Sequence, residues 1–171
     1  MKNVTTHLVV AASLIALGAC AKKKVEDLPL PPDNGSATAT GDADADAGRP
    51  LPGSQEDFVA SVVADRVFFD TDLFDIDAED QATLRSQAGW LARYPQTRVT
   101  IEGHADERGT RDYNLALGDR RANSAKNYLA SLGVDETRIS TISYGKERPD
   151  AVGSDEGAWA RNRRAVTVTV R

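Results

Sequence analysis

The chain has 171 residues, with 21 lysines and arginines against 26 aspartates and glutamates, so its formal net charge is −5. This acidic balance, without a basic stripe interleaved with aromatic residues, argues against a nucleic-acid-binding protein. Cys20 is the single cysteine, which excludes an intrachain disulfide. The two histidines are His7 and His104, and the first lies in an expected signal segment, so a metal site built from several histidines is excluded as well.

The first 19 residues have the layout of a secretory signal. Lys2 supplies a positive charge, residues 8–17 are apolar apart from one serine, and small residues precede Cys20. The apolar run is too short to span a bilayer, which takes about 20 apolar residues. The letters LGAC at residues 17–20 resemble a lipobox, the motif at which bacterial lipoproteins are cleaved and acylated. We therefore expect residues 1–19 to be removed and the acylated Cys20 to anchor the chain in a membrane.

Residues 20–54 are predicted to form a disordered linker behind the lipidated cysteine. They contain several prolines and the low-complexity run from Ser36 to Gly48, and they lack aromatic residues. Such a composition cannot bury enough apolar surface to offset the entropy lost on ordering the chain. About 34 flexible residues have a root-mean-square span on the order of 30 Å, so this segment would give a membrane anchor reach.

Residues 55–171 have the pattern of one globular domain. Asp77, with Asp80 three places on, predicts a helix start, and the Tyr94-Pro95 pair predicts its end. The expected elements, in chain order, are a strand at 59–69, a helix at 77–94, a strand at 98–102, a helix at 113–132, a strand at 139–144, a short helix at 155–161 and a strand at 165–170. Strands that alternate with amphipathic helices predict an α/β two-layer sandwich, with about four strands in a mixed sheet and two main helices on one face.

The densest polar cluster is the run EGHADERG at residues 102–109, which directly follows a predicted strand. Arg121 lies four residues after Leu117 and four before Ala125, so it projects from the apolar face of its helix. A buried guanidinium needs a partner, and Asp106 is the natural candidate. An acid and a base at one rim can hold a zwitterion, with Asp106 receiving an ammonium and Arg121 forking onto a carboxylate. An ordinary structural ion pair between them is the alternative interpretation.

The other candidate side chains favour no reaction. An enzyme acting on the cell wall would need His104 paired with Ser124 or Ser143, and nothing in the sequence marks either serine as activated. We therefore expect no catalytic residue, no cofactor and no metal, with His104 organising its loop beside the pocket. Our interpretation of the remaining candidates is that Glu107 and Arg108 are solvated, that Trp90 and Trp159 pack, and that Arg161, Arg163 and Arg164 form a solvated basic patch.

Several motifs together resemble one known family. The run GHADERGT at residues 103–110, then Tyr113-Asn114, then LGDRRA at residues 117–122 closely resembles the OmpA-like peptidoglycan-binding domain. The segments VFFD at 67–70, SYGKERP at 143–149 and NRRAV at 162–166 fit the same family at the same intervals. Taken together with the lipobox and the linker, these motifs most closely resemble the lipoprotein members of this family that belong to the Tol–Pal system.

The resemblance implies a site for diaminopimelate in the peptidoglycan stem peptide. Asp106 and Arg121 match the family's residues that hold the amino group and the carboxylate of this ligand. Asn114 and Leu117 match positions that border the pocket, and the loop around Phe69 and Asp70 resembles the segment whose backbone completes it. Two positions depart from the common pattern: Gly118 stands where the family often has serine, and Ala125 where it often has valine.

The resemblance also implies a role and partners. It describes a lipoprotein of the outer membrane whose domain faces the periplasm, binds peptidoglycan without cleaving it and tethers the membrane to the wall. TolB and other Tol proteins are its implied protein partners, in envelope integrity and cell division.

Overall fold

The computed structural model describes residues 49–170. The expected signal peptide at 1–19, the expected lipidation at Cys20 and the expected linker as far as residue 48 lie outside the described residues. The elements in chain order are α1 (Gln55–Ser61), β1 (Arg66–Phe68), α2 (Ala78–Arg93), β2 (Arg98–His104), α3 (Arg111–Ser131), the 3-10 turn η1 (Glu136–Arg138), β3 (Ile139–Gly145), α4 (Glu156–Asn162) and β4 (Arg164–Val170).

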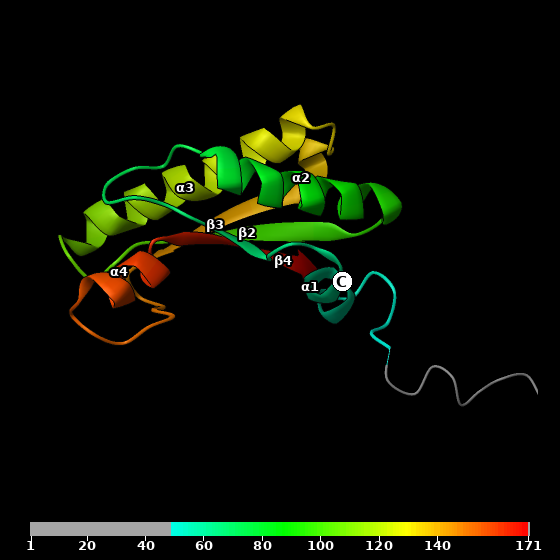
Figure 1. Cartoon of the computed structure of the whole chain (residues 1–171). Coiled ribbons are helices and arrows are strands. Elements are labelled where there is room, and N and C mark those ends of the chain that lie inside the picture. Colours follow the sequence, from blue (N-terminus) through cyan, green and yellow to red (C-terminus); the bar gives the residue numbers. More distant parts are fainter. Residues whose placement is uncertain (1–48, 171) are drawn as a thin grey trace, which may run out of the picture. The chain divides into compact units, whose positions relative to one another are not determined.

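The strands form one four-stranded mixed sheet in the order β1-β4-β2-β3. β4 pairs antiparallel with both β1 and β2, whereas β2 and β3 are parallel, so a helical crossover must connect them. That crossover is α3, which lies with α2 on the same face of the sheet (Figure 1). The predicted two-layer sandwich, with a four-stranded mixed sheet and two main helices on one face, is therefore confirmed.

The strand expected at 59–69 is wrong over most of its length. Residues 55–61 form α1, and β1 is only three residues long. The helix starts because the Ser54 hydroxyl accepts a hydrogen bond from the Asp57 amide, and acidic residues occupy its first turn. Val59 and Val63, whose type suggested a strand, are 49 % and 75 % exposed. The helix-start signal at Ser54 therefore outweighed the β-propensity of the valines.

The two long helices begin where capping side chains place them. The Asp77 carboxylate accepts from the Asp80 amide at 2.8 Å, as the sequence predicted. The Asp80 carboxylate in turn accepts from the Phe68 amide at 3.1 Å, which ties α2 to the edge strand β1. Burial raises the pKa of this carboxyl to about 6. Thr110 caps α3 by accepting from the Tyr113 amide, so this helix begins two residues earlier than expected.

Two glycines let α3 touch β2 backbone to backbone. A Cβ added to Gly103 would lie 1.8 Å from the carbonyl oxygen of Gly118, and one added to Gly118 would lie 2.4 Å from the Ser143 Oγ. The Ser143 hydroxyl, which donates to the Leu115 carbonyl at 2.7 Å, fills the space beside Gly118. The departure from serine at position 118 therefore has a physical reason. This close approach sets the first turns of α3 directly over the end of β2, where the polar loop begins.

We expect Gly103→Ala to lower the free energy of unfolding by at least about 3 kcal/mol, because its methyl group fits only if α3 moves away from β2. Gly89→Ala is the matched control, since a Cβ at Gly89 in α2 meets nothing within 4 Å. That control should stabilise the protein by up to about 1 kcal/mol. Urea denaturation followed by circular dichroism measures both. Equal midpoints for the two variants would show that the glycine contact does not constrain the packing.

Candidate ligand-binding site

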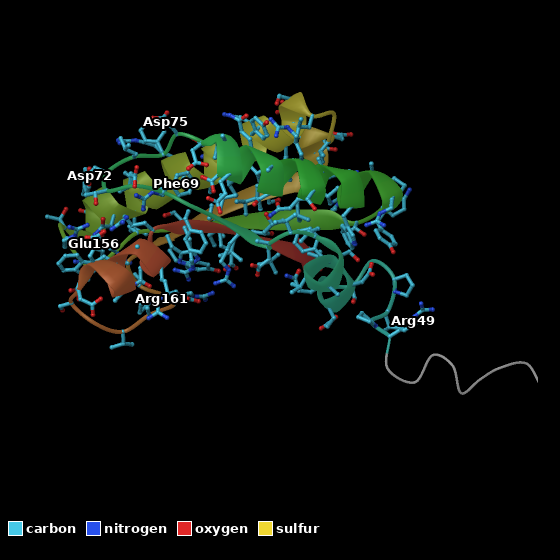
Figure 2. The ribbon with its side chains drawn as sticks, viewed as in Figure 1. Arg49, Phe69, Asp72, Asp75, Glu156 and Arg161 are labelled. Carbon is cyan, nitrogen blue, oxygen red and sulfur yellow. The ribbon has the colours of Figure 1, made fainter. Side chains whose placement is uncertain are left out.

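A cavity of about 270 Å³ opens at the end of the molecule where β2 passes into α3. Three segments build it: the loop after β1, the loop after β2 and the first turns of α3. Its lining residues are Thr71, Asp72, Asp106, Arg108, Gly109, Tyr113, Asn114, Leu117 and Arg121. Asp72 lies at this end of the structure and Arg49, the first described residue, at the other (Figure 2). A cavity of this size can admit a small polar group such as the end of an amino acid.

Arg121 lies at the base of this cavity with 0 % of its surface exposed. Its guanidinium donates from Nε to the Leu73 carbonyl at 2.9 Å, from Nη1 to the His104 carbonyl at 2.8 Å and from Nη2 to the Asp70 carbonyl at 3.0 Å. It also lies 5.2 Å from the centre of the Phe69 ring. Burial lowers the pKa of Arg121 to about 10, so it stays charged at neutral pH. The Asp106 carboxylate is a neighbour of Arg121, as expected, but the direct hydrogen-bond partners are carbonyl oxygens, through which Arg121 fastens the loop after β1 to the end of β2.

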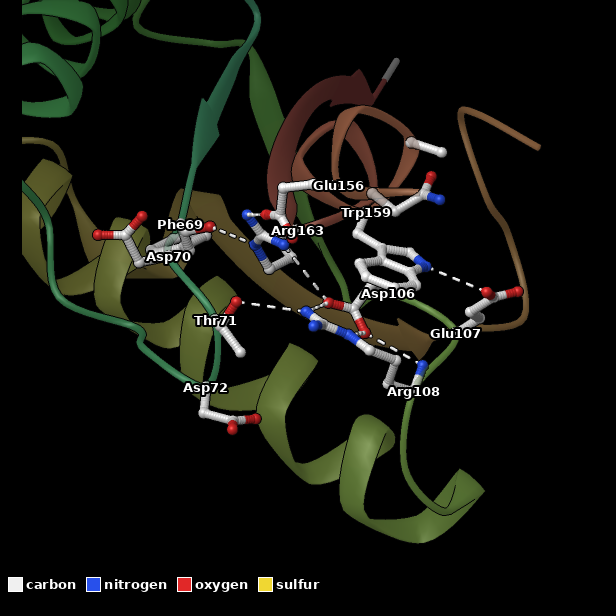
Figure 3. Close-up of polar contacts among 12 residues, drawn as sticks. Phe69, Asp70, Thr71, Asp72, Asp106, Glu107, Arg108, Glu156, Trp159 and Arg163 are labelled. Atoms are coloured by element: carbon white, nitrogen blue, oxygen red, sulfur yellow. Dashed lines mark hydrogen bonds and ion pairs between the residues drawn. The ribbon is translucent and has the colours of Figure 1, made fainter. Parts of the chain in front are cut away.

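Asp106 lines the same cavity but bonds to other arginines (Figure 3). The Arg108 side chain donates from Nε to Oδ1 at 3.1 Å and from Nη2 to Oδ2 at 2.6 Å, and the Arg108 amide adds a bond of 3.1 Å. Arg163 Nη1 lies 3.6 Å from Oδ2. Burial alone would raise the pKa of Asp106, but the bonds from Arg108 and the charge of Arg163 outweigh it and lower the pKa below 3.8. The structural ion pair with Arg121, our alternative interpretation, is therefore not the arrangement that the described residues form.

Arg108 and Glu107 are exposed, as expected, and the structure shows that both also have partners. The Arg108 guanidinium stacks over Trp159 with its Cζ 4.2 Å from the ring centre, and it donates to the Thr71 hydroxyl at 3.2 Å. The Trp159 ring is itself held, because its Nε1 donates to the Glu107 carboxylate at 3.0 Å (Figure 3). Trp159 comes from α4, more than 50 positions away in the chain, so no local pattern could place it here.

Arg163 and Arg164 are buried, so the expected solvated basic patch is wrong for both, although Arg161 is exposed. Arg163 donates from Nε to the Phe69 carbonyl at 2.9 Å and from Nη2 to the Glu156 carboxylate at 2.8 Å. A buried arginine needs such partners, because its unpaired charge would be costly. Arg163 therefore holds β1, α4 and Asp106 together behind the cavity.

Asn114 and Leu117 line the cavity, as the resemblance implied, and both are buried. The Asn114 side-chain amide donates to the Arg108 carbonyl at 2.7 Å, which fixes the loop after β2 against α3. Leu117 supplies an apolar wall. Lys146 pins the other side of the same loop, donating to the Gly109 carbonyl at 2.7 Å.

The loop after β1 contributes different residues from those expected. Phe69 and Asp70 line a neighbouring cavity of about 400 Å³, and Asp70 reaches the site only through the carbonyl that Arg121 binds. Thr71 and Asp72 line the site itself. Asp72 has a φ of 59°, a conformation that aspartate tolerates better than most residues, and it accepts a bond of 3.0 Å from the Tyr113 hydroxyl. The second aspartate of the DTD run at residues 70–72 was the available sequence signal for this position.

His104 and Ser143 are engaged in the architecture of the site. His104 is 2 % exposed, and burial together with nearby arginines lowers its pKa to about 4. The Ser143 hydroxyl donates to the Leu115 carbonyl rather than to a base. Among residues 49–170, no group of three or more histidines, cysteines, aspartates and glutamates could hold a metal ion. Within that same stretch, no helix combines the length and apolar character needed to cross a membrane.

Residues 68–163 match the sequence model of the OmpA family, and the chain belongs to that family. The chain is 53 % identical over 161 residues to the peptidoglycan-associated lipoprotein of Agrobacterium fabrum, covering 94 % of this chain and 85 % of the relative. It is 55 % identical over 154 residues to the Rhizobium meliloti protein of the same name, covering 90 % and 81 %. Within the OmpA family it therefore groups with the peptidoglycan-associated lipoproteins.

Solved structures share the fold. The crystal structure of the peptidoglycan-associated lipoprotein from Burkholderia pseudomallei superposes with a TM-score of 0.61 at 42 % identity, covering 66 % of this chain and 93 % of that one. The C-terminal domain of Helicobacter pylori MotB superposes with a TM-score of 0.59 at 19 % identity, covering 63 % and 84 %, which shows a common fold alone.

We expect Arg121→Lys to lower the free energy of unfolding by about 3 kcal/mol, because an ammonium cannot reach three separate carbonyls in the geometry of a guanidinium. Amide hydrogen exchange should also become faster in residues 70–74, which lose their fastening to α3. Arg111→Lys, at an exposed position of α3 that pairs with Glu147, is the control and should change neither quantity. Unchanged exchange in the Arg121 variant would show that the loop is held by other contacts.

Proposed function

We propose that this cavity binds the zwitterionic end of diaminopimelate in the peptidoglycan stem peptide. The observation that carries the proposal is a carboxylate, Asp106, and a buried guanidinium, Arg121, that line one small cavity without bonding to each other. Asp106 is paired with Arg108 and Arg163 instead, so the acid and the guanidinium of the cavity do not neutralise each other. An amino-acid end supplies an ammonium and a carboxylate on one carbon, one group for each of these two side chains.

The hydrogen-bond donors and acceptors of the cavity match the carboxylate and the ammonium of such a ligand. The Arg121 guanidinium has five N–H groups, and three of them donate to carbonyls. Its remaining N–H groups lie on the two terminal nitrogens and can donate as a fork to the ligand carboxylate. Asp106 and Asp72 then accept from the ligand ammonium, and Leu117 packs against its carbon chain.

The charges around the cavity support a ligand with no net charge. Asp72, Asp106 and Glu156 supply three negative charges, and three positive charges come from Arg108, Arg121 and Arg163, so the sum is zero. A neutral zwitterion leaves that balance intact. A simple cation or anion would leave an uncompensated charge in a partly buried site.

The proposal extends to the whole chain. Acyl chains on Cys20 hold the protein in the outer membrane with its domain in the periplasm, the proposed linker between Cys20 and the domain gives reach, and the domain holds the wall. This is non-covalent tethering, in keeping with a buried His104 and a Ser143 hydroxyl bonded to backbone. TolB and other Tol proteins are the proposed protein partners, in envelope integrity and cell division, and nucleic acid is not a proposed ligand.

The test is co-sedimentation with purified peptidoglycan. We expect Asp106→Asn to weaken pelleting at least tenfold, because the amide keeps the shape of the side chain but loses the charge that an ammonium needs. Asp119→Asn, at an exposed position of α3 outside the cavity, is the control and should pellet like the unmodified protein.

A second comparison tests the ligand carboxylate. Peptidoglycan that contains lysine in place of diaminopimelate keeps the ammonium and lacks the side-chain carboxylate. The unmodified protein should remain in the supernatant when this wall is pelleted. Equal amounts of the unmodified protein pelleted with both kinds of wall, or of the Asp106 variant and its control pelleted with the diaminopimelate wall, would overturn the assignment of this pocket.

The membrane anchor predicts a separate outcome. Cys20→Ala removes the only thiol that could be acylated, so the protein should be lost from the outer-membrane fraction. Fractionation and immunoblotting of cells that produce either form measure this loss. A variant that remained with the outer membrane in detergent-washed, wall-free fractions would contradict lipid anchoring.

A further inference from the structure

The Asp106 carboxylate already carries a cation within the protein. Arg108 binds both of its oxygens, and the shorter of these contacts is 2.6 Å. The Arg108 side chain is 39 % exposed and that of Asp106 only 9 %, so Arg108 covers the carboxylate on its solvent side. A ligand ammonium that comes from solvent meets this guanidinium before it reaches Asp106.

Of the arginines around the cavity, Arg108 is the one that is free to move. Arg121 is fixed by carbonyl oxygens, and Arg163 is fixed by the Phe69 carbonyl and Glu156, with both side chains buried. The side chain of Arg108 has weaker ties besides Asp106, namely the Thr71 hydroxyl at 3.2 Å and the face of Trp159. Because its side chain is partly exposed, the Arg108 guanidinium can leave Asp106 without becoming a buried unpaired charge, at the cost of the two charged hydrogen bonds that it makes there.

Trp159 keeps the displaced guanidinium close. Its ring lies 4.2 Å from the Arg108 Cζ and is fixed by its bond to Glu107. A cation over an indole ring is attracted by the ring electrons, so Arg108 can rotate on this face without returning to bulk water. The stack therefore leaves the guanidinium beside the cavity when its bonds to Asp106 are broken.

From this geometry we propose that Arg108 is a specificity-determining residue that competes with the ligand ammonium for Asp106 and then pairs with the ligand carboxylate. This rests on the proposed function of the same cavity. A zwitterion offers its own carboxylate as a new partner for the displaced Arg108 guanidinium. A cation without a carboxylate breaks the Asp106–Arg108 pair and offers nothing in return, so the site rejects it.

Two small probes separate these cases. The first is meso-diaminopimelate, and the second is cadaverine, which has the same carbon chain and amino groups without the two carboxylates. Isothermal titration of both probes into the unmodified protein should show diaminopimelate binding at least tenfold more tightly. In Arg108→Met, whose side chain keeps its length over Trp159, cadaverine should bind about tenfold more tightly than in the unmodified protein. The preference for diaminopimelate should fall by about the same factor.

Arg111→Met is the matched control, because Arg111 is an exposed arginine that pairs with Glu147 outside the cavity. It should keep the preference of the unmodified protein. A second measurement needs no variant: the Arg108 Nε–H resonance should shift when diaminopimelate is added and return when the ligand is removed.

The outcomes are distinct. If the unmodified protein binds diaminopimelate, while the preference is the same in Arg108→Met and the Arg108 resonance does not move, then Arg108 is no competitor and the proposed function stands without it. If the unmodified protein does not bind diaminopimelate, the proposed function fails, and the role of Arg108 fails with it.

Discussion

The buried guanidinium of Arg121 is the interaction on which the arrangement of the site depends. It joins the carbonyls of Asp70 and Leu73, in the loop after β1, to the carbonyl of His104 at the end of β2. The Asp70 carbonyl also accepts from the Leu73 amide at 3.2 Å, so this loop is closed on itself as well as fastened to the guanidinium. One side chain from α3 therefore positions the two loops that form opposite walls of the cavity.

The arginines around the cavity have two different roles. Arg121 and Arg163 are buried and hold backbone, so their charge is part of the scaffold, whereas Arg108 is partly exposed and pairs with Asp106, the carboxylate that we propose for the ligand ammonium. The cavity is thus fixed by two buried arginines and neutralised by a third that is partly exposed. Such preorganisation reduces the entropy that a ligand loses on binding.

Much of the fold follows from local signals in the sequence. Asp77 caps α2, Gly133 follows the end of α3, and the alternating apolar residues of β2 and β4 give strands with the expected positions. The prediction of a strand at 59–69 was wrong because the Ser54 side chain caps a helix in a segment whose valines favour a strand. Residue propensity alone does not decide between the two structures. The part of this segment that does form a strand, β1, pairs with β4, the last strand of the chain.

The sequence by itself determined the family, the acid and guanidinium of the site, and the apolar face from which Arg121 projects, because these depend on residue type and on spacing within one element. Only the tertiary structure decided the partners. Arg121 bonds to carbonyls, Asp106 bonds to Arg108 and Arg163, and Trp159 in α4 supplies the platform for Arg108. The physical reason is that any carbonyl or carboxylate can satisfy a guanidinium, so its partner is set by which segments the sheet brings together, and the pairing of β4 between β1 and β2 brings α4 to this site.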